Sequence, residues 1–172
     1  VFKKELLTAL LWGIASDLGQ IIHLSGVPCR LQPQVKFLNS ITFEQLFQIP
    51  VMEAIELEFL TPTSFKQESI IQTFPLPEMV FNGLRRRWNQ SAPEALHFPE
   101  TPWQAVVSAY DLHTQVMKMQ AEEIGTVGWI RYRFFDPDQA KAATVLSHFA
   151  IFSGVGRKTT NGMGMAQLSK KG

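Results

Sequence analysis

GVGRKTTNGMG, at residues 154–164, is the stretch around which the rest of the chain is expected to fold. Glycine tolerates positive φ angles and lets another backbone approach closely, so four glycines in this run predict a tight loop. Two cations and two hydroxyls between them suit phosphate oxygens, as do the N–H groups of a tight turn. The residues concerned are Gly154, Gly156, Gly162 and Gly164 for the loop, and Arg157, Lys158, Thr159 and Thr160 for the anion. The stretch therefore predicts a loop that binds a polyanion.

Two common phosphate-binding motifs do not fit this loop. A P-loop opens a helix after a strand and carries Lys directly after its last glycine, whereas here Lys158 follows Arg157 and the loop follows a predicted helix. The G-x-G-x-x-G fingerprint fails because Thr159 occupies the position of its third glycine. A plain glycine-capped helix end is the remaining alternative, although such a cap needs only one glycine.

The hydrophobic pattern from residue 53 onward predicts the element order βαββαβ. Strands are predicted at 55–60, 106–119, 126–135 and 162–168. Helices are predicted at 77–89 and 136–154. This order is that of the ferredoxin-like unit, an α+β sandwich in which a four-stranded antiparallel sheet carries both helices on one face.

The second of these helices has clear start and stop signals. Asp136 is a predicted N-cap, Pro137 suits the first turn, and Gly154 is expected to end the helix. Its spacing predicts an inward face made of Ala142, Val145, Leu146, Phe149 and Phe152. The glycine-rich loop is therefore expected to join this helix to the last strand.

Three segments in a fixed order resemble one known family. FAIFSGVGRKTTNGMGMAQL (149–168) resembles the C-terminal glycine-rich signature of the CRISPR-associated repeat-processing endoribonucleases, which belong to the RAMP superfamily of ferredoxin-like RNA-binding proteins. FLTPTSFKQ (59–67) and PLPEMVFNGLRRRWN (75–89) agree with the same family. The first fifty residues match it only loosely.

The resemblance also implies a domain organisation, because the family normally has two ferredoxin-like domains in tandem. Residues 1–50 contain a predicted helix at 3–18, extended segments at 21–25 and 30–38 separated by Gly26-Val27-Pro28, and a short helix at 42–47. We interpret residues 1–50 as the tail of an incomplete N-terminal ferredoxin-like domain. Residues 51–172 are interpreted as the C-terminal ferredoxin-like RNA-binding domain that carries the glycine-rich loop.

Composition restricts the class of protein and its compartment. Of the 172 residues 45% are hydrophobic and 18% are charged, which indicates a folded core rather than a disordered chain. Cys29 is the only cysteine and cannot form an intrachain disulfide, so a cytoplasmic location is expected. The longest apolar segment, 6–15, is too short to cross a bilayer, and no membrane partner is expected.

Charge distribution says more than the net charge of +1. Residues 154–172 carry four cations and no acid, and residues 85–87 form a second basic cluster. Acidic residues gather elsewhere, at 53–58 and 122–123. A nearly neutral chain with two basic spots can still bind RNA locally.

The resemblance implies a metal-free reaction in which the ribose 2′-OH attacks its own phosphate, leaving a 2′,3′-cyclic phosphate and a 5′-OH. Such a reaction needs a base, an acid and positive charge. The histidines do not lie at zinc-ligand spacing, so neither a metal nor another cofactor is expected: they are His23, His97, His113 and His148. In many family members the catalytic histidine lies near the first helix of the first domain. No position here matches it, and the catalytic residues stay unassigned.

RNA contacts are expected first from the loop, because the resemblance implies that it packs against the RNA cleft. Arg85 and Arg86 are further candidates, although a solvated helix end is the alternative, and three successive arginines on a helix cannot all face one row of phosphates. Arg131 and Arg133 share a strand face with Trp129, which fits either RNA stacking or packing between domains. Lys66 is another candidate.

The interpretation that follows is CRISPR RNA maturation: the chain binds the repeat stem-loop and takes part in metal-independent cleavage. One alternative is a non-catalytic RAMP-type subunit that holds guide RNA in an effector complex. A second is a ferredoxin-like domain that binds a nucleotide or a protein. The expected partners are CRISPR repeat RNA, a multisubunit effector complex and a second copy of the chain.

Overall fold

The computed structural model describes residues 12, 13, 15, 17–24, 27–32, 40–118 and 121–169. The chain divides into two compact units, residues 1–41 and 42–172, and each is described by itself. Most of the helix predicted at 3–18 falls outside the described residues, and the segment 33–38 of a predicted extended stretch lies wholly outside them.

The first unit contains an antiparallel hairpin. Strand β1 (Ile21–Leu24) pairs with β2 (Val27–Arg30), with Ile21 opposite Arg30. Val27 and Pro28 were expected to separate two extended segments, but they lie inside β2. Pro28 fits because it stands opposite His23 in a two-stranded ribbon, where a strand has a free edge.

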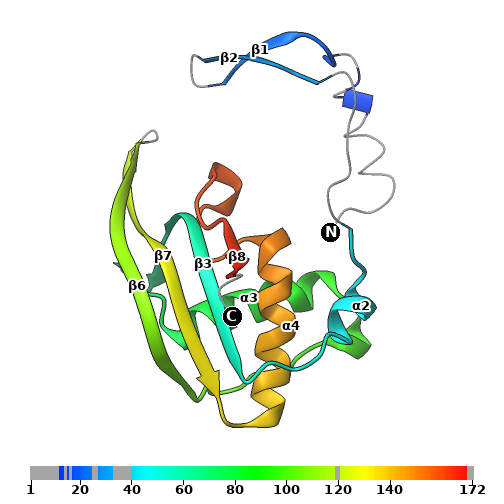
Figure 1. Ribbon diagram of the computed structural model, residues 1–172, viewed down its shortest axis with the longest axis vertical. Coiled ribbons are helices and arrows are strands. Elements are labelled where there is room, and N and C mark those ends of the chain that lie inside the picture. The colour runs from blue at the N-terminus through cyan, green and yellow to red at the C-terminus, as the bar shows by residue number, and fades with distance from the viewer. Residues whose placement is uncertain are drawn as a thin grey trace. The chain divides into compact units, whose positions relative to one another are not determined.

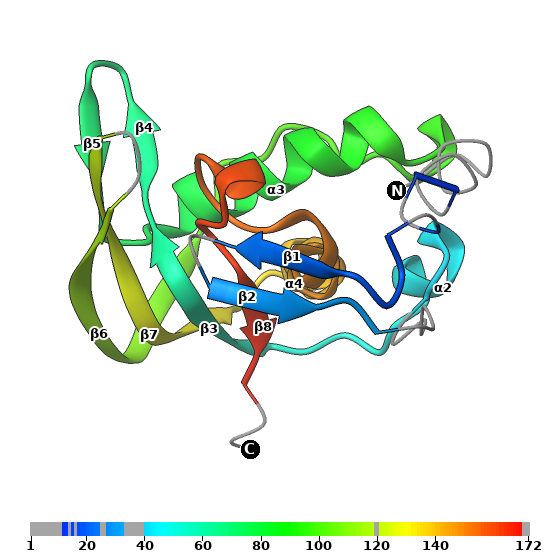
Figure 2. The same cartoon turned by 90° about the horizontal axis from the view of Figure 1, so that it is seen from above.

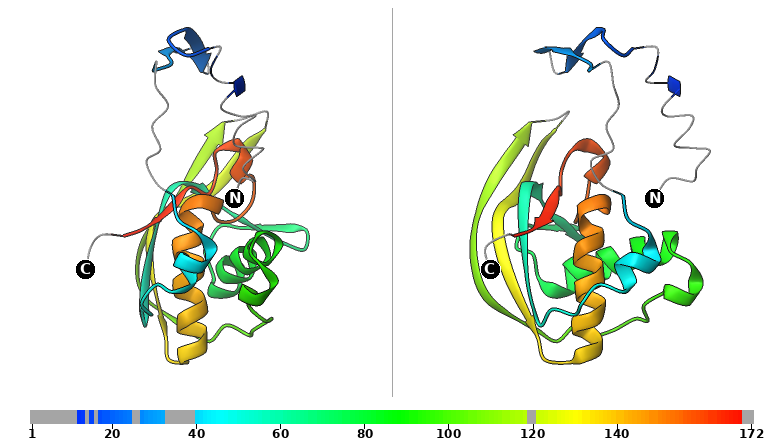
Figure 3. Two further views of the ribbon diagram at one scale, coloured as in Figure 1. Left: turned by 90° about the vertical axis from the view of Figure 1, so that its right-hand side faces the viewer. Right: turned by 45° about the vertical axis from the view of Figure 1, so that its right-hand side comes forward.

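The second unit is built on a four-stranded antiparallel sheet. Its strands are β3 (Ala54–Thr63), β6 (Ala105–Lys118), β7 (Glu122–Phe134) and β8 (Ala166–Leu168), in the order β6-β7-β3-β8. Helices α3 (Pro77–Ser91) and α4 (Pro137–Ser153) make the two crossovers. Figure 1 shows the sheet with its helices, and Figure 3 shows both helices on one face of it. The predicted ferredoxin-like βαββαβ fold is confirmed.

Alternation along the central strands creates the core. Ile55, Leu57 and Phe59 of β3 are fully buried, while Glu56 and Glu58 point to the other face. The same alternation buries the residues of β7 that face the helices: Ile130, Tyr132 and Phe134. Helix α3 contributes Val80, Phe81, Leu84 and Trp88 to this core. The ring of Phe81 packs edge-on against those of Tyr132 and Phe134, which ties α3 to the sheet.

Helix α4 begins and ends where its cap residues predict. The Asp136 carboxylate accepts hydrogen bonds from the backbone N–H groups of Asp138 and Gln139, at 2.8 and 3.0 Å. Gly154 ends the helix with φ +66° and donates its N–H to Ala150 O at 2.8 Å. The glycine-rich loop therefore starts at a fixed point on the core.

The predicted inward position of Phe152 is wrong, since its side chain is 46% exposed. The middle of α4 is covered on nearly all sides, and residues 142–147 are buried without a break. The last turn lacks that cover on the side where Phe152 lies, although Val145, two turns earlier on the same side, is buried.

Helix α2 (Phe43–Phe47) belongs to the second unit. It begins with the predicted cap at Thr42, whose side chain accepts from Gln45 N while the Gln45 side chain accepts from Thr42 N. Its Phe43 ring packs edge-on against Trp88 of α3, with ring centres 5.0 Å apart. This contact places the segment before the sheet on the helical side of the core.

Several element boundaries differ from the predicted ones. The last strand spans only Ala166–Leu168 instead of 162–168, because the preceding residues fold into a turn, η2 (Thr159–Asn161), and a loop. Strand β3 continues through Pro62 to Thr63, with a shift of register after Phe59. A short turn, η1 (Glu94–Leu96), interrupts the irregular connection at 90–105, as expected.

A second hairpin was not predicted. Strands β4 (Phe65–Gln67) and β5 (Ile70–Gln72) pair around a turn in which Glu68 has φ +55°. Figure 2 shows this hairpin projecting from the body of the unit. It sets the position of Lys66 relative to α3.

Candidate nucleic-acid interface

The glycine-rich loop, residues 154–164, folds back on itself between α4 and β8. Val155 donates its N–H to Gly164 O at 2.8 Å, which closes the base of the loop. Within the loop, Asn161 donates to Lys158 O at 2.9 Å, and Lys158 takes a left-handed conformation with φ +54°. Val155 and Met163 are buried, and they anchor the loop in the core. The loop therefore has a defined conformation, with its polar residues at its outer end.

Two glycines are required by close backbone contacts. A Cβ at Gly164 would lie 1.9 Å from Val155 O, and one at Gly156 would lie 2.4 Å from Ser64 O. Both residues also have positive φ angles, +71° and +76°. No other residue fits these positions without moving the backbone.

The loop is pinned to the end of β3. Arg157 donates its N–H to Ser64 O at 2.9 Å, and Gly164 donates to Pro62 O at 3.1 Å. Met165 donates to the Thr61 hydroxyl at 2.9 Å. The segment 59–67 and the glycine-rich run, far apart in sequence, therefore form one site.

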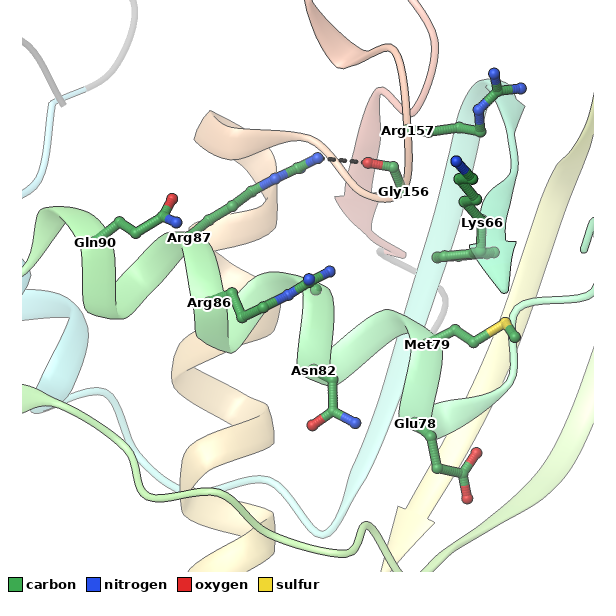
Figure 4. A pocket seen from close by; sticks show the side chains of 11 residues that line it. Lys66, Glu78, Met79, Asn82, Arg86, Arg87, Gln90, Gly156 and Arg157 are labelled. Carbon is green, nitrogen blue, oxygen red and sulfur yellow. Dashed lines mark hydrogen bonds between the residues drawn. The ribbon is translucent and has the colours of Figure 1, made fainter. Parts of the chain in front are cut away.

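Arg87 of α3 holds the same loop from the other side. Its Nη1 donates to Ser153 O at 3.0 Å and to Gly154 O at 2.6 Å, and its Nη2 donates to Gly156 O. These carbonyls include orphan acceptors at the end of α4, which the guanidinium satisfies. Burial, and secondly the charge of Arg86, lowers the pKa of Arg87, but an arginine remains charged at any working pH. Figure 4 shows the Arg87 side chain reaching Gly156.

The two cations of the loop share one acidic partner on β7. Arg157 Nη1 lies 2.5 Å from Glu123 Oε2, and Lys158 Nζ pairs with Glu123 Oε1. The Lys158 hydrogen bond, together with the Arg157 interaction, lowers the pKa of the Glu123 carboxyl. The loop's charge is therefore partly offset by the Glu123 carboxylate, which lies far from the loop in sequence.

The remaining polar residues of the loop take different positions. Thr160 is exposed, and its hydroxyl contacts Asn161 Oδ1 at 3.3 Å. Thr159 is half-buried, with its methyl group beside Gly154 and Gly164. Gly162 is exposed at the end of η2 with φ +89°. Thr160 thus presents its hydroxyl to solvent, while Thr159 packs the loop.

The three successive arginines of α3 point to three different places. Arg85 lies 3.5 Å from Glu100 Oε1, with a side chain only 14% exposed. Arg86 is exposed, and Arg87 is bound to the loop carbonyls. The prediction that the three cannot face one row of phosphates agrees with this arrangement.

Arg86 opens onto a cleft between α3, β4 and the loop. The cleft has a volume of about 370 Å³, and its lining includes Lys66, Asn82, Gly156 and Arg157. Figure 4 shows Arg86 and Lys66 directed into this space from opposite walls. The structure therefore brings Arg86, Lys66 and the loop together.

The predicted cations of the sheet lie elsewhere. Arg131 and Arg133 alternate with buried residues of β7, so they lie on the sheet face away from the helices. Arg131 donates to Glu56 Oε2 from Nε at 3.0 Å and Nη2 at 2.7 Å, and it lies 5.9 Å above the Trp129 ring. Arg133 is exposed and lines a pocket of about 590 Å³ together with Arg131 and Ser108. These residues form a surface separate from the loop and the cleft.

The histidines of the second unit do not gather at either place, and His23 belongs to the first unit. His148 contacts Thr144 O through Nδ1 at 2.9 Å, His97 contacts Ala92 O through Nε2 at 3.0 Å, and His113 and His23 are exposed. Within the described ranges, no three His, Cys, Asp or Glu side chains come close enough to hold a metal ion. In that same part of the chain, no helix is long and apolar enough to span a bilayer.

Comparison with known proteins places these features in one family. Residues 57–166 match the family model of the CRISPR-associated endoribonuclease Cas6, a range that includes most of β3, all of α3 and the whole glycine-rich loop. No curated protein sequence matches the chain.

Solved structures give the same result. A Cas6 product complex is 25% identical with a TM-score of 0.80, covering 97% of this chain and 74% of that one. A Cas6 substrate mimic complex is 25% identical with a TM-score of 0.77, covering 96% and 76%. A Cas6 of Thermus thermophilus is 26% identical with a TM-score of 0.67, covering 75% and 58%.

Proposed function

The chain belongs to the family of the CRISPR-associated endoribonuclease Cas6, and we propose that it binds CRISPR repeat RNA and takes part in metal-independent cleavage of precursor CRISPR RNA. The observation that carries the proposal is the convergence of three segments on one loop. Ser64 after β3 and Arg87 of α3 both bond to the glycine-rich loop, at Arg157 N and at Gly156 O. All of these residues lie within the range that matches the family.

The loop supplies the chemistry that an RNA backbone needs. Arg157 and Lys158 offer positive charge, the Thr160 hydroxyl is exposed, and close backbone approach is provided by the glycines. Such contacts go to phosphates and orient the strand, so binding falls as salt rises. An A-form stem would be recognised by shape rather than through its deep groove.

Cleavage in this proposal is attack of a ribose 2′-OH on the adjacent phosphate. As the 2′-oxygen bonds to phosphorus and the 5′-oxygen of the next nucleotide leaves, negative charge develops on the non-bridging oxygens of the pentacoordinate state, where a cation of the loop can stabilise it. The general base and acid remain unassigned, because none of the three histidines of the second unit, His97, His113 and His148, lines the cleft or bonds to the loop. The role proposed for this chain is to bind and orient the RNA and to supply positive charge.

A cleavage assay tests the proposal. The chain is incubated in EDTA with an end-labelled repeat hairpin and with hairpins that carry a single 2′-deoxy substitution at each candidate position. We expect one cut that a single deoxy substitution abolishes, with a 2′,3′-cyclic phosphate on the upstream product. Binding without a cut would instead support a subunit that holds guide RNA, and a cut that survives every deoxy substitution would contradict the mechanism.

Three finer parts of the proposal concern partners and location. The chain passes its RNA to a multisubunit CRISPR effector complex, pairs as a homodimer, and works in the cytoplasm. Light scattering with and without the hairpin tests the second part, because a dimer doubles the measured mass. The half-buried single Cys29 agrees with a reducing compartment.

A further inference from the structure

We propose that the cleft between α3 and β4 is a second phosphate-binding site, which holds a backbone phosphate of the RNA beyond the glycine-rich loop. The inference rests on the proposed function, since it takes the RNA to be the source of the phosphate. The chemistry recognised is an oxyanion with several acceptor oxygens, bound by Lys66 and Arg86, with the Asn82 amide as a further donor at the edge of the cleft.

The first observation is that the two exposed cations of the cleft have no carboxylate partner in the described ranges. Neither Lys66 nor Arg86 lies within ion-pair distance of a carboxylate anywhere in the described ranges. The other arginines on this side of the molecule are engaged, Arg85 with Glu100, Arg157 with Glu123 and Arg87 with carbonyls. Two exposed and unpaired cations directed into one cleft form a local positive site.

The second observation is the orientation of an amide at the same place. Trp103 Nε1 donates to Asn82 Oδ1 at 3.0 Å. With its oxygen used in this way, Asn82 has its Nδ2 group left to donate. Asn82 lines the cleft, and Figure 4 shows its side chain pointing away from Arg86 and Lys66, so its amide is a further donor at the edge of the cleft. The point charge of Lys66 and the guanidinium fork of Arg86 match the acceptor oxygens of a phosphate.

The third observation is the face of α3 that lines the cleft. Met79, Gly83, Arg86 and Gln90 recur at helical spacing, and they form one stripe along the helix. A Cβ at Gly83 would meet nothing within 4 Å, so core packing does not require a glycine there. Its effect is to leave the helix surface open beside Arg86, where a ligand can approach the backbone.

The acid that lines the cleft does not block this site. Glu78 lies in the first turn of α3, and Figure 4 shows its carboxylate pointing away from Arg86 and Lys66. The charge facing the middle of the cleft is positive, with the half-buried guanidinium of Arg87 adding to it from the wall. An anion is the ligand that this arrangement favours.

Continuity with the loop identifies the source of the phosphate. Gly156 and Arg157 line the cleft and belong to the glycine-rich loop. A strand bound along the loop therefore passes directly into the cleft, where its next phosphates meet Arg86 and Lys66. A free nucleotide carries the same group, and the experiment has to separate these two sources.

The test measures binding of a repeat hairpin blocked by 2′-deoxy substitution, by fluorescence anisotropy across a salt series. The variants are Arg86→Gln, Lys66→Gln and the double variant, and both residues are exposed, so the fold is expected to survive. The matched control is Arg85→Gln, which removes the same charge from the neighbouring position but faces Glu100. We expect each single variant to bind roughly fivefold to tenfold more weakly near 0.1 M salt. The slope of log affinity against log salt concentration should become less steep by about one in each single variant and by about two in the double variant.

The control is expected to match the wild type. Equal affinities and salt slopes for the wild type, the control and the cleft variants would overturn the proposed phosphate site in the cleft and would leave the proposed function in place. Failure of the wild type to bind any hairpin would overturn the proposed function, and RNA as the source with it. A parallel titration with adenosine monophosphate and with inorganic phosphate distinguishes the sources. Tighter binding of either than of the hairpin, lost in Arg86→Gln, would overturn RNA as the ligand.

Discussion

The glycine-rich loop and the α3–β4 cleft are both basic, but they use their residues in opposite ways. In the loop, Arg157 and Lys158 are paired with Glu123, and the glycines allow close contacts to the backbone around Ser64. In the cleft, Lys66 and Arg86 have no acidic partner in the described part of the chain. The glycine-rich motif, which stands out in the sequence, thus mainly shapes the site. The positive charges that no carboxylate offsets belong to the surface residues Lys66 and Arg86 beside it.

The largest effect is expected from a substitution that prevents the loop from closing. Gly164→Ala places a Cβ 1.9 Å from Val155 O at a positive φ, so the loop cannot close as it does now. We expect the free energy of unfolding to fall by about 3 kcal/mol or more. Hairpin binding is expected to be lost as well, and urea unfolding with anisotropy measures both.

Gly162→Ala is the matched control for this variant. Gly162 also has a positive φ, +89°, but its Cβ would meet only Met117 Cε at 3.6 Å. Conformational strain alone costs about 1–2 kcal/mol. Equal losses in the two variants would mean that strain, and not the close backbone contact, determines the effect.

Arg87 is expected to give the next largest effect, because it joins the loop to α3. Arg87→Met removes the hydrogen bonds to the carbonyls of Ser153, Gly154 and Gly156. We expect a loss of about 2–3 kcal/mol in unfolding free energy. Arg87→Lys should recover only part of it, since one ammonium cannot reproduce the fork. Full recovery by lysine would show that charge alone suffices.

Glu123→Gln sharpens the comparison by making the loop resemble the cleft. With the carboxylate neutral, Arg157 and Lys158 become available to phosphates, so hairpin affinity should rise about threefold to tenfold with a steeper salt slope. Glu122→Gln is the control, because it removes the same charge from the next residue. Weaker binding by Glu123→Gln would mean that the carboxylate orients the cations for RNA instead of competing with it.

The smallest expected effect is a pH dependence of stability. The pKa of Glu123 is lowered in the folded chain from its ordinary value near 4.5, first by Lys158. Its stabilising contribution is therefore complete above that ordinary value and is lost as the pH falls through the folded pKa. Thermal unfolding should show the wild type losing stability faster than Glu123→Gln below about pH 5. Parallel curves for the two proteins would contradict the ion pairs.

Much of the fold could be predicted because local patterns and packing agree. The alternation in β3 and β7 and the caps of α4 at Asp136 and Gly154 all appear where expected. The final strand was predicted to start at Gly162 rather than Ala166, because the residues before it fold into the turn η2 and a loop that no hydrophobic period reveals. The β4–β5 hairpin was missed because Glu68, not a glycine, takes the positive φ of its turn.

The site was predictable only in part. The glycines and the cations of the loop are adjacent in sequence, so their chemistry is visible there. Arg87 and Glu123 reach the loop from positions 66 to 69 and 34 to 35 residues away, and only the tertiary structure brings them to it. The three arginines of α3 look equivalent in sequence, but in the fold Arg85 pairs with Glu100, Arg87 binds the loop carbonyls, and Arg86 opens onto the cleft.

The most direct test of the central claim is an NMR titration of the chain with the uncleavable repeat hairpin. If the loop and the cleft form the interface, the largest shifts should appear at the backbone amides of residues 157–161 and at the side-chain amide of Asn82. The Trp129 indole, on the outer face of the sheet, should change little. Large shifts at Trp129 with an unchanged loop would contradict the account, because they would place the RNA on the sheet surface of Arg131 and Arg133.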